Sequence, residues 1–224
     1  MPPMLFALAF FLNLANGSQH WLRSCKIEAL RFDFPLLRQA AEPLCKSLSN
    51  KPMKKILETN RLILRELNIQ DSENFYKLNL NSNVIKYTGN SAFKNVEESK
   101  IFLENYQDYK LNGFGRWAVI NKENNEFLGW CGLKYDKDLD ETDIGFRFFE
   151  ENWNKGYATE SAKACINYGF ENLSLKTIIG RAMSENIASI KVLEKIGLEF
   201  VKEFDFDEKN KGVIYKIENN KAFT

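Results

Sequence analysis

Residues 143–160, DIGFRFFEENWNKGYATE, carry the strongest structural signal in the chain. The first half alternates apolar residues at Ile144, Phe146 and Phe148, a spacing that is typical of a β-strand. Polar residues 150–154 then form a turn, and Gly156 precedes small or hydroxylic residues that suit the first turn of a helix. The stretch therefore predicts a strand, a short loop and a helix N-terminus in direct succession.

The helix N-terminus predicted here has the chemistry of an anion site. The first backbone N–H groups of a helix lack partners within the helix and carry a partial positive charge, so they bind phosphate groups well. Gly156 and Ala158 allow an anion to come close, and Lys155 adds a positive charge. The stretch matches neither the phosphate loop of nucleotide hydrolases nor the G-x-G-x-x-G dinucleotide motif. It indicates a phosphate-binding loop of another kind.

Apolar periodicity and turn residues predict the elements on either side. About seven strands are expected: residues 61–67, 117–121, 127–135, 142–149, 177–182, 200–206 and 213–217. About four helices are expected: residues 72–80, 96–111, 156–172 and 186–196. Asn-rich and Asp-rich turns separate the second, third and fourth strands, which indicates an antiparallel meander. The predicted fold class is therefore α/β (α+β), with a mixed, largely antiparallel central sheet.

Composition and charge limit the function classes. The 224 residues include 31 Lys and Arg against 30 Asp and Glu, so the formal net charge is +1. This balance argues against a basic protein that binds nucleic acid. Apolar residues make up 44% of the chain, enough to bury a core and unlike a disordered protein.

The first 52 residues differ from the rest of the chain. All five prolines and His20 lie there. Residues 1–52 carry six basic and three acidic side chains, a net charge of +3, whereas residues 53–224 carry 25 basic and 27 acidic side chains, a net charge of −2. The apolar run 4–14 has the length of a signal peptide but no preceding Lys or Arg, and it is too short to span a bilayer. We therefore expect residues 1–52 to be an atypical N-terminal extension that either does not belong to the native protein or is disordered. Residues 53–224 are expected to form the domain. A signal or membrane anchor at residues 4–14 is the alternative.

Residues 53–224 lack the side chains for two common kinds of chemistry. They contain no histidine, and Cys131 and Cys165 stand singly within apolar patterns. A zinc site of the Cys/His kind and a histidine-dependent catalytic triad are therefore excluded there. We expect both cysteines to be core residues and expect no metal.

Four sequence motifs, in order, give the chain a specific resemblance to a known family. They are ETNRLILR at 58–65, DIGF at 143–146 with WNKGYATE at 153–160, NIAS at 186–189, and LEKIGL at 193–198. Over residues 56–217 the chain resembles the GNAT superfamily of acyl-CoA-dependent N-acetyltransferases. It is most similar to the branch typified by the acetyltransferases of ribosomal-protein N-termini. The resemblance implies a GNAT-like acyl-CoA-binding fold, with acetyl-CoA as the acyl-donor cosubstrate.

The resemblance also implies which residues bind acetyl-CoA. The loop before the helix matches the element whose backbone amides hold the CoA pyrophosphate, with Trp153 where Gln or Arg is usual. The strand before it would pair with the pantetheine amides and polarise the thioester carbonyl, and the motif at 186–189 would contact the pantetheine arm. The cofactor-binding residues implied are Phe148, Phe149, Asn154, Lys155, Gly156, Tyr157, Ala158, Thr159, Asn186 and Ser189.

A general base is a further feature that the resemblance implies. Asp143 stands where the family often places a strand Glu and is the first candidate, and Glu141 on the same strand face is the second. Asp143 as a surface charge at a strand end is the alternative. The family's general-acid Tyr is replaced by Leu193, so no general acid is assigned.

Together these features predict an acyltransferase that moves an acetyl group from acetyl-CoA to a primary amine by direct attack in a ternary complex. The favoured acceptor is a protein N-terminal α-amine. The alternatives are a small-molecule amine (polyamine, amino acid or aminoglycoside) or a non-catalytic acyl-CoA-binding module. We expect a cytoplasmic protein, monomer or homodimer, with no nucleic-acid partner and no membrane partner unless residues 1–52 are native.

Overall fold

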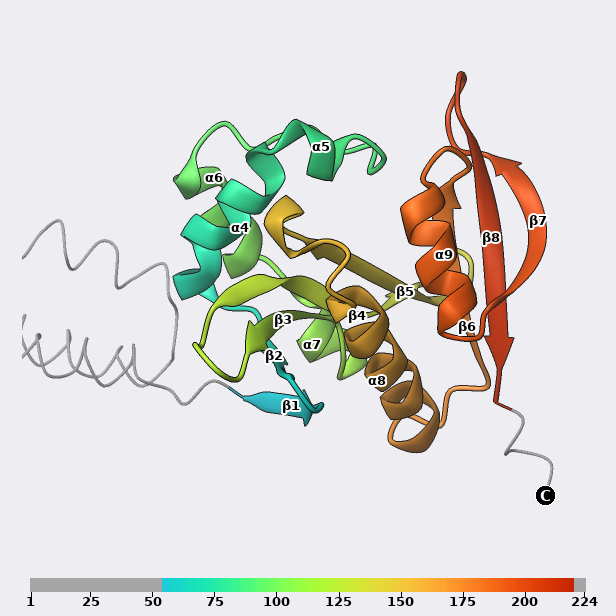
Figure 1. Ribbon diagram of the computed structural model, residues 1–224, viewed down its shortest axis with the longest axis horizontal. Coiled ribbons are helices and arrows are strands. Elements are labelled where there is room, and N and C mark those ends of the chain that lie inside the picture. Colours follow the sequence, from blue (N-terminus) through green and yellow to red (C-terminus); the bar gives the residue numbers. More distant parts are fainter. Residues whose placement is uncertain (1–53, 220–224) are drawn as a thin grey trace, which may run out of the picture. The chain divides into compact units, whose positions relative to one another are not determined.

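The computed structural model describes residues 54–219 (Figure 1). The prediction about residues 1–52 lies outside this range. The strands are β1 Lys55–Glu58, β2 Leu62–Glu66, β3 Arg116–Asn121, β4 Phe127–Asp136, β5 Glu141–Phe148, β6 Thr177–Met183, β7 Glu199–Asp205 and β8 Lys211–Glu218. The helices are α4 Ser72–Leu80, α5 Ser82–Ile85, α6 Val96–Glu104, α7 Asp108–Asn112, α8 Tyr157–Glu171 and α9 Ile187–Lys195, with 3-10 turns η2 Ile69–Asp71 and η3 Glu150–Asn152.

All eight described strands form one sheet in the order β1-β2-β3-β4-β5-β6-β8-β7. β5 and β6 run parallel, and all the other neighbours are antiparallel. The parallel pairing consists of one pair of Cα partners, Asp143 and Ile179, whereas β5 pairs with β4 along its whole length. Figure 1 shows β6, β8 and β7 at a steep angle to β3, β4 and β5. The mixed, largely antiparallel sheet is confirmed, and it divides between β5 and β6.

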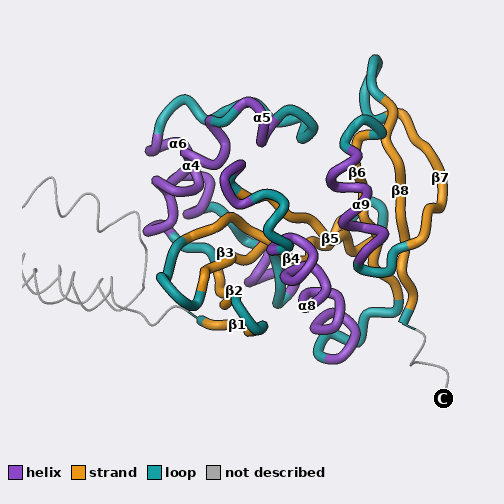
Figure 2. The backbone as a smooth tube through the Cα atoms, in the orientation of Figure 1, coloured by secondary structure: helices purple, strands orange, loops and turns teal. Residues whose placement is uncertain are grey.

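Alternate residues of the central strands pack into two hydrophobic clusters on opposite faces. Trp117 and Val119 of β3 belong to the cluster that includes Cys165 of α8 and Leu193 of α9. Their neighbour Ala118 belongs to the cluster under α4, α5 and α6. Figure 2 shows these three helices grouped together, apart from α8. The sheet therefore has one face covered by α8 and α9 and another covered by α4 to α6.

The predicted core role of the two cysteines is confirmed. Cys131 of β4 and Cys165 of α8 are both fully buried, and their sulfur atoms lie 3.7 Å apart. Burial raises the pKa of the Cys165 thiol well above its usual value, and the hydrogen bond with Cys131 acts in the same direction. Both cysteines therefore pack as small apolar side chains.

Asparagine side chains begin several of these elements. The Oδ1 atoms of Asn68, Asn81, Asn95 and Asn186 each accept a hydrogen bond from a backbone N–H at the start of η2, α5, α6 and α9 respectively. These N–H groups have no partner inside the helix, so a capping oxygen stabilises each start. The asparagine-rich sequence thus sets element boundaries locally.

The helices and strands differ from the expected ones at two points. The single helix expected over 96–111 is two helices, α6 and α7, because Asn105 caps α6 by donating to the Ile101 carbonyl. The buried residues of α6 are Ser99 and Leu103, whereas the side chain of Ile101 is 44% exposed. The sheet also has one strand more than expected, β1, which extends it beyond β2.

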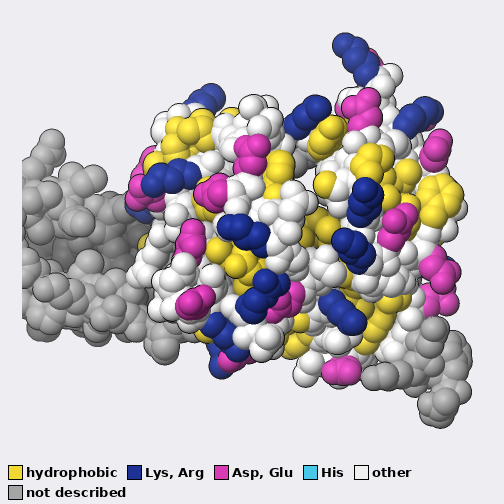
Figure 3. All heavy atoms as spheres, in the orientation of Figure 1, with side chains coloured by type: hydrophobic (Ala, Val, Ile, Leu, Met, Phe, Trp, Pro, Cys, Tyr) yellow, Lys and Arg dark blue, Asp and Glu magenta, His cyan; other side chains and the backbone are white. Residues whose placement is uncertain are grey.

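The surface carries charges of both signs. Figure 3 shows basic and acidic side chains interspersed on the face turned to the viewer. This agrees with the formal net charge of +1. Within residues 54–219, no helix combines the length and apolarity that crossing a bilayer requires.

Candidate active site

The division of the sheet brings two helix N-termini to the same edge. β5 and β6 are parallel, so their carboxyl ends lie at one edge of the sheet. α8 follows β5 after the turn η3, and α9 follows β6 after a short turn. The positive ends of both helix dipoles therefore flank the point where the two strands diverge. Ligands commonly bind at such an edge in folds of this kind.

The loop between β5 and α8 is shaped to expose backbone N–H groups. Asn154 and Gly156 both have left-handed backbone conformations, with φ of 60° and 82°. Gly156 is the N-cap of α8, and no side chain caps this helix. The loop at residues 153–156 is exposed, while the helix start at Tyr157, Ala158 and Thr159 is half-buried. These features fit the predicted anion site, because the N–H groups at the helix start remain available to a ligand.

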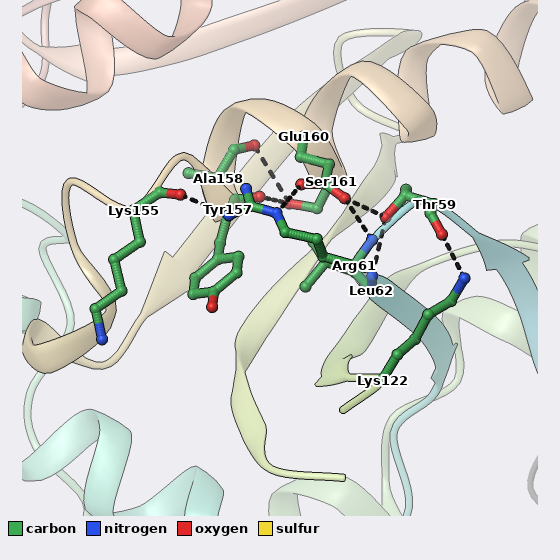
Figure 4. A network of polar contacts seen from close by, with 9 residues as sticks. All are labelled: Thr59, Arg61, Leu62, Lys122, Lys155, Tyr157, Ala158, Glu160 and Ser161. Carbon is green, nitrogen blue, oxygen red and sulfur yellow. Dashed lines mark hydrogen bonds and ion pairs between the residues drawn. The ribbon is translucent and has the colours of Figure 1, made fainter. Parts of the chain in front are cut away.

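A network from the β1–β2 turn holds the start of α8 in place (Figure 4). The Arg61 Nε donates to Glu160 Oε2 at 2.7 Å, and the Arg61 backbone N–H and Thr59 Oγ1 both donate to Glu160 Oε1. Arg61 Nη1 also donates to the Lys155 carbonyl at 3.1 Å, and its guanidinium lies 4.6 Å from the centre of the Tyr157 ring. Arg61 therefore positions the loop and the helix together. The sequence motif at 58–65 contained Arg61 without indicating this role.

Glu160 depends on this network for its charge. Burial alone would raise its pKa, but hydrogen bonds from Thr59 and Arg61 outweigh burial and lower the pKa from its ordinary value of 4.5. A carboxylate with a lowered pKa stabilises the fold above its unfolded-state pKa, and this contribution is lost as the pH falls through the folded-state pKa.

We expect Glu160→Gln to lower the free energy of unfolding by about 1 kcal/mol at neutral pH, because a charged acceptor is replaced by a neutral one. The difference from the unmodified protein should shrink as the pH falls below about 4.5, the ordinary pKa that Glu160 has in the unfolded chain, towards its lower folded-state pKa. Urea unfolding at about pH 7 and about pH 4 measures both effects. The exposed Glu151 in η3 provides the control Glu151→Gln, for which a change in the free energy of unfolding below about 0.5 kcal/mol is expected. A constant difference at both pH values for Glu160→Gln would contradict this account.

The last residues of β5 use their polar groups within the protein. The Phe148 side chain is buried in the core, and its carbonyl accepts a hydrogen bond of 3.0 Å from the Trp153 indole. The Phe149 N–H donates to the Leu128 carbonyl at 3.1 Å. Trp153 is 41% exposed, so its ring anchors the loop by one edge and presents the rest to solvent. Phe148 and Phe149 thus shape the loop, and the Phe148 carbonyl and the Phe149 N–H already have hydrogen-bond partners within the protein.

The two residues predicted on α9 lie at its first turn. Asn186 is the N-cap, and its Oδ1 accepts a hydrogen bond of 3.1 Å from the Ser189 N–H. Both residues are half-buried, and Ile187 between them is 54% exposed. The turn lies next to the diverging end of β6, as the resemblance requires.

Both candidate bases are paired with arginines. Asp143 Oδ2 accepts a hydrogen bond of 2.6 Å from Arg116 Nη2, and the exposed fractions of the two side chains are 19% and 15%. Glu141 is 42% exposed and accepts from Arg181 Nη2. The sequence analysis did not find either arginine, because each lies about 30 to 40 residues from its partner.

Arg116 crosses the sheet to reach Asp143. Its backbone is on β3, two strands away, and its guanidinium passes over Gly145 of β5, where an added Cβ would lie 2.7 Å from it. Burial alone would lower the pKa of Arg116, but its attraction and hydrogen bond to Asp143 outweigh burial and raise that pKa. Gly145 thus leaves the space that the ion pair occupies.

Comparison with known proteins gives a consistent assignment. The family described as "Acetyltransferase (GNAT) domain" matches residues 61–199. An uncharacterized N-acetyltransferase, p20, from Bacillus licheniformis is 32% identical over 145 residues, covering 64% of this chain and 82% of that protein. The FsC-acetyl coenzyme A-N(2)-transacetylase of Aspergillus fumigatus is 33% identical over 159 residues, covering 66% of each chain.

A solved structure supports the same assignment. The crystal structure of a GNAT-family acetyltransferase from Bacillus anthracis superimposes with a TM-score of 0.64 at 28% identity, covering 72% of this chain and 97% of that one. The residues that the family model matches, 61–199, include β5, β6 and the loop before α8. This chain belongs to the GNAT family of acetyl-CoA-dependent N-acetyltransferases.

Proposed function

We propose that this N-acetyltransferase acts on an α-amine, with a protein N-terminus as the favoured acceptor. The observation that carries this choice is the pairing of both candidate bases with arginines. A carboxylate oxygen that already accepts a hydrogen bond from a guanidinium is less available to take a proton from the acceptor. An α-amine has a pKa of about 8 and is neutral in roughly one molecule in ten at neutral pH, whereas a lysine amine is almost fully protonated. An α-amine therefore needs less help from a base.

The residues at the β5–β6 division have separate roles in this proposal. The backbone N–H groups at the start of α8 bind the pyrophosphate of CoA, and Gly156 lets the phosphate approach them. Lys155 is exposed beside them and adds positive charge. Bound acetyl-CoA supplies the activated acyl group. The edge of β5 beyond Asp143, where the ladder to β6 ends, holds the pantetheine arm. Asn186 and Ser189 border the same arm from α9.

A small-molecule amine is the second candidate acceptor. The Aspergillus fumigatus relative is named for transfer to an N(2) position of FsC. That name favours an acceptor other than a protein terminus for that enzyme, and the shared family allows the same for this chain.

The experiment that tests the proposal measures thiol release from acetyl-CoA with a panel of amines. The panel contains peptides with free N-termini, the same peptides with blocked N-termini and an internal lysine, free amino acids, a polyamine and an aminoglycoside. We expect turnover with the free N-termini and none with the blocked peptides. Turnover confined to the blocked peptides, the polyamine or the aminoglycoside would contradict the α-amine proposal.

We expect Asp143→Asn to slow turnover about 10-fold to 100-fold, most strongly at low pH, and to leave CoA affinity unchanged. Asp143 is our first candidate to take the proton from the acceptor, and a base matters more when more of the acceptor is protonated. The asparagine still offers an oxygen to Arg116 but leaves its charge without an anion, so urea unfolding of this variant is measured beside its kinetics. The measurement is kcat/KM against pH.

Asp136→Asn is the control for this variant. Asp136 is the last residue of β4, where its Oδ1 accepts a hydrogen bond from the Asp138 N–H, and its replacement removes the same charge without touching Arg116. A pH profile of Asp143→Asn that matches the unmodified enzyme would leave Asp143 as the structural partner of Arg116 alone.

A further inference from the structure

Arg147 differs from the other arginines of the domain in its partners. Residues 54–219 contain five arginines. Four of them form an ion pair with a carboxylate: Arg61 with Glu160, Arg65 with Asp71, Arg116 with Asp143, and Arg181 with Glu141. Within the same described residues, Arg147 has no such pair. Its Nη1 and Nη2 donate to amide oxygens, Asn79 Oδ1 and Asn90 Oδ1.

The surroundings of Arg147 make its unpaired charge costly. The guanidinium lies 5.4 Å from the centre of the Trp130 ring, and Arg116 lies 5.5 Å from the same ring. Burial and the positive charge of Arg116 lower the pKa of Arg147 to about 10. The side chain therefore remains protonated at neutral pH, half-buried and beside a second cation. A buried charge without an opposite charge destabilises a protein unless a ligand supplies one.

Arg147 also lies on the strand that borders the candidate active site. It is in β5, four residues after Asp143 and two after Gly145, so alternation places all three on the same face of the strand. Asn79 at the end of α4 and Asn90 after α5 approach Arg147 from the helices that cover this face. The neighbours Ile144 and Phe148 instead pack in the cluster with α8. Arg147 therefore lies on the face opposite the one that α8 covers.

The guanidinium has donors left for a ligand. Arginine carries five N–H groups in a planar fork, and the two hydrogen bonds to Asn79 and Asn90 use two of them. The fork matches a carboxylate, which it can bind through two parallel hydrogen bonds. The two asparagines hold the guanidinium in position without neutralising it. Arg147 is partly exposed, so a ligand can reach it.

We propose that Arg147 binds a carboxylate of the acceptor, so that the preferred substrate of this enzyme is an acidic amine. Gly145, on the part of β5 beyond Asp143 where we place the pantetheine arm, is two residues away along the strand, about 7 Å. That separation fits a carboxylate a few bonds from the reacting amine. Two sources share this chemistry: the α-carboxylate of a free amino acid, and an acidic side chain near a peptide N-terminus. This inference rests on the proposed transfer to an amine and specifies its acceptor.

The test compares acceptors that differ only in charge. The pairs are a peptide beginning with Asp against one beginning with Asn, and a free amino acid against its amide. We expect the unmodified enzyme to have a kcat/KM about 10-fold to 100-fold higher for the acidic member of at least one pair, as for a hydrogen-bonded charge pair. The peptide pair and the amino-acid pair distinguish the two sources of the carboxylate.

The variant Arg147→Gln should remove this preference. We expect kcat/KM for the acidic acceptor to fall to that of its neutral analogue, while the neutral acceptor and CoA affinity change less than about 2-fold. Arg147→Lys, which keeps the charge but lacks the fork, should retain part of the preference. A purely structural role would lower both members of a pair equally. Equal loss on both, or no preference in the unmodified enzyme, would overturn the proposal.

The proposed function and this inference can fail separately. If no amine in the pairs is turned over, transfer to an α-amine is wrong, and calorimetric binding of the same pairs in the presence of CoA then tests Arg147. Tighter binding of the acidic member, lost in Arg147→Gln, would still support carboxylate recognition. Equal binding of both members would refute it.

Discussion

Replacement of Gly156 by glutamate is expected to abolish binding of CoA, with affinity reduced by at least about 100-fold. Two effects add. The φ of 82° at Gly156 costs a residue with a Cβ about 1 to 2 kcal/mol. The new carboxylate would also stand at the start of α8, where we place the pyrophosphate, and would both repel it and bind the same N–H groups. Calorimetric titration with CoA measures the loss.

Gly113→Glu is the matched control for the backbone effect. Gly113 follows α7 with a φ of 78°, is exposed, and an added Cβ there would meet no atom within 4 Å. This variant therefore carries the same strain and the same charge at a position away from α8. We expect it to lose stability but to bind CoA normally. Normal CoA binding by Gly156→Glu would show that the phosphate site is elsewhere.

Replacement of Arg116 by methionine should lower the free energy of unfolding by about 3 kcal/mol. Methionine fills part of the space above Gly145 but leaves the Asp143 carboxylate, 19% exposed, without its cation. Removing one member of a buried ion pair is far more damaging than replacing both, because an unpaired buried charge remains. Urea unfolding monitored by tryptophan fluorescence gives the value.

Two further variants separate the ion pair from simple loss of packing. In Arg116→Met combined with Asp143→Asn, the charge is removed from both sides, and more than half of the lost stability should return. Lys77→Met removes an exposed partner of Glu73 on α4, and we expect a change below about 1 kcal/mol. If the double variant is no more stable than Arg116→Met, packing rather than charge explains the effect.

The secondary structure around residues 143–160 was predictable because its signals are local. Alternation of apolar residues along β5, a left-handed glycine before α8 and asparagine caps at helix starts each act within a few residues. The prediction of one helix over 96–111 was wrong for a local reason. Asn105 caps α6 and ends it, although the apolar periodicity continues beyond this residue. The strand β1 was missed because it is four residues long and is stabilised by pairing with β2.

The candidate site was predictable only in part. The motif predicted Gly156 and its neighbours as phosphate-binding residues, because a phosphate-binding helix start needs small residues in sequence. The arginines were not found, although all of them are visible in the sequence. Arg61 reaches a carboxylate 99 residues away and Arg116 one 27 residues away, and no spacing rule connects such positions.

The linear sequence was thus sufficient to predict most of the strands and helices, the loop and helix start at residues 153–160, and the family, since each depends on neighbours along the chain. The folded sheet was needed to pair Asp143 and Glu141 with arginines and, among the residues that the structure describes, to leave Arg147 without a carboxylate. Charges interact through space over a few ångströms, whatever their separation in the sequence. The prediction of an acidic acceptor could therefore come only from the arrangement of β3, β4 and β5 side by side.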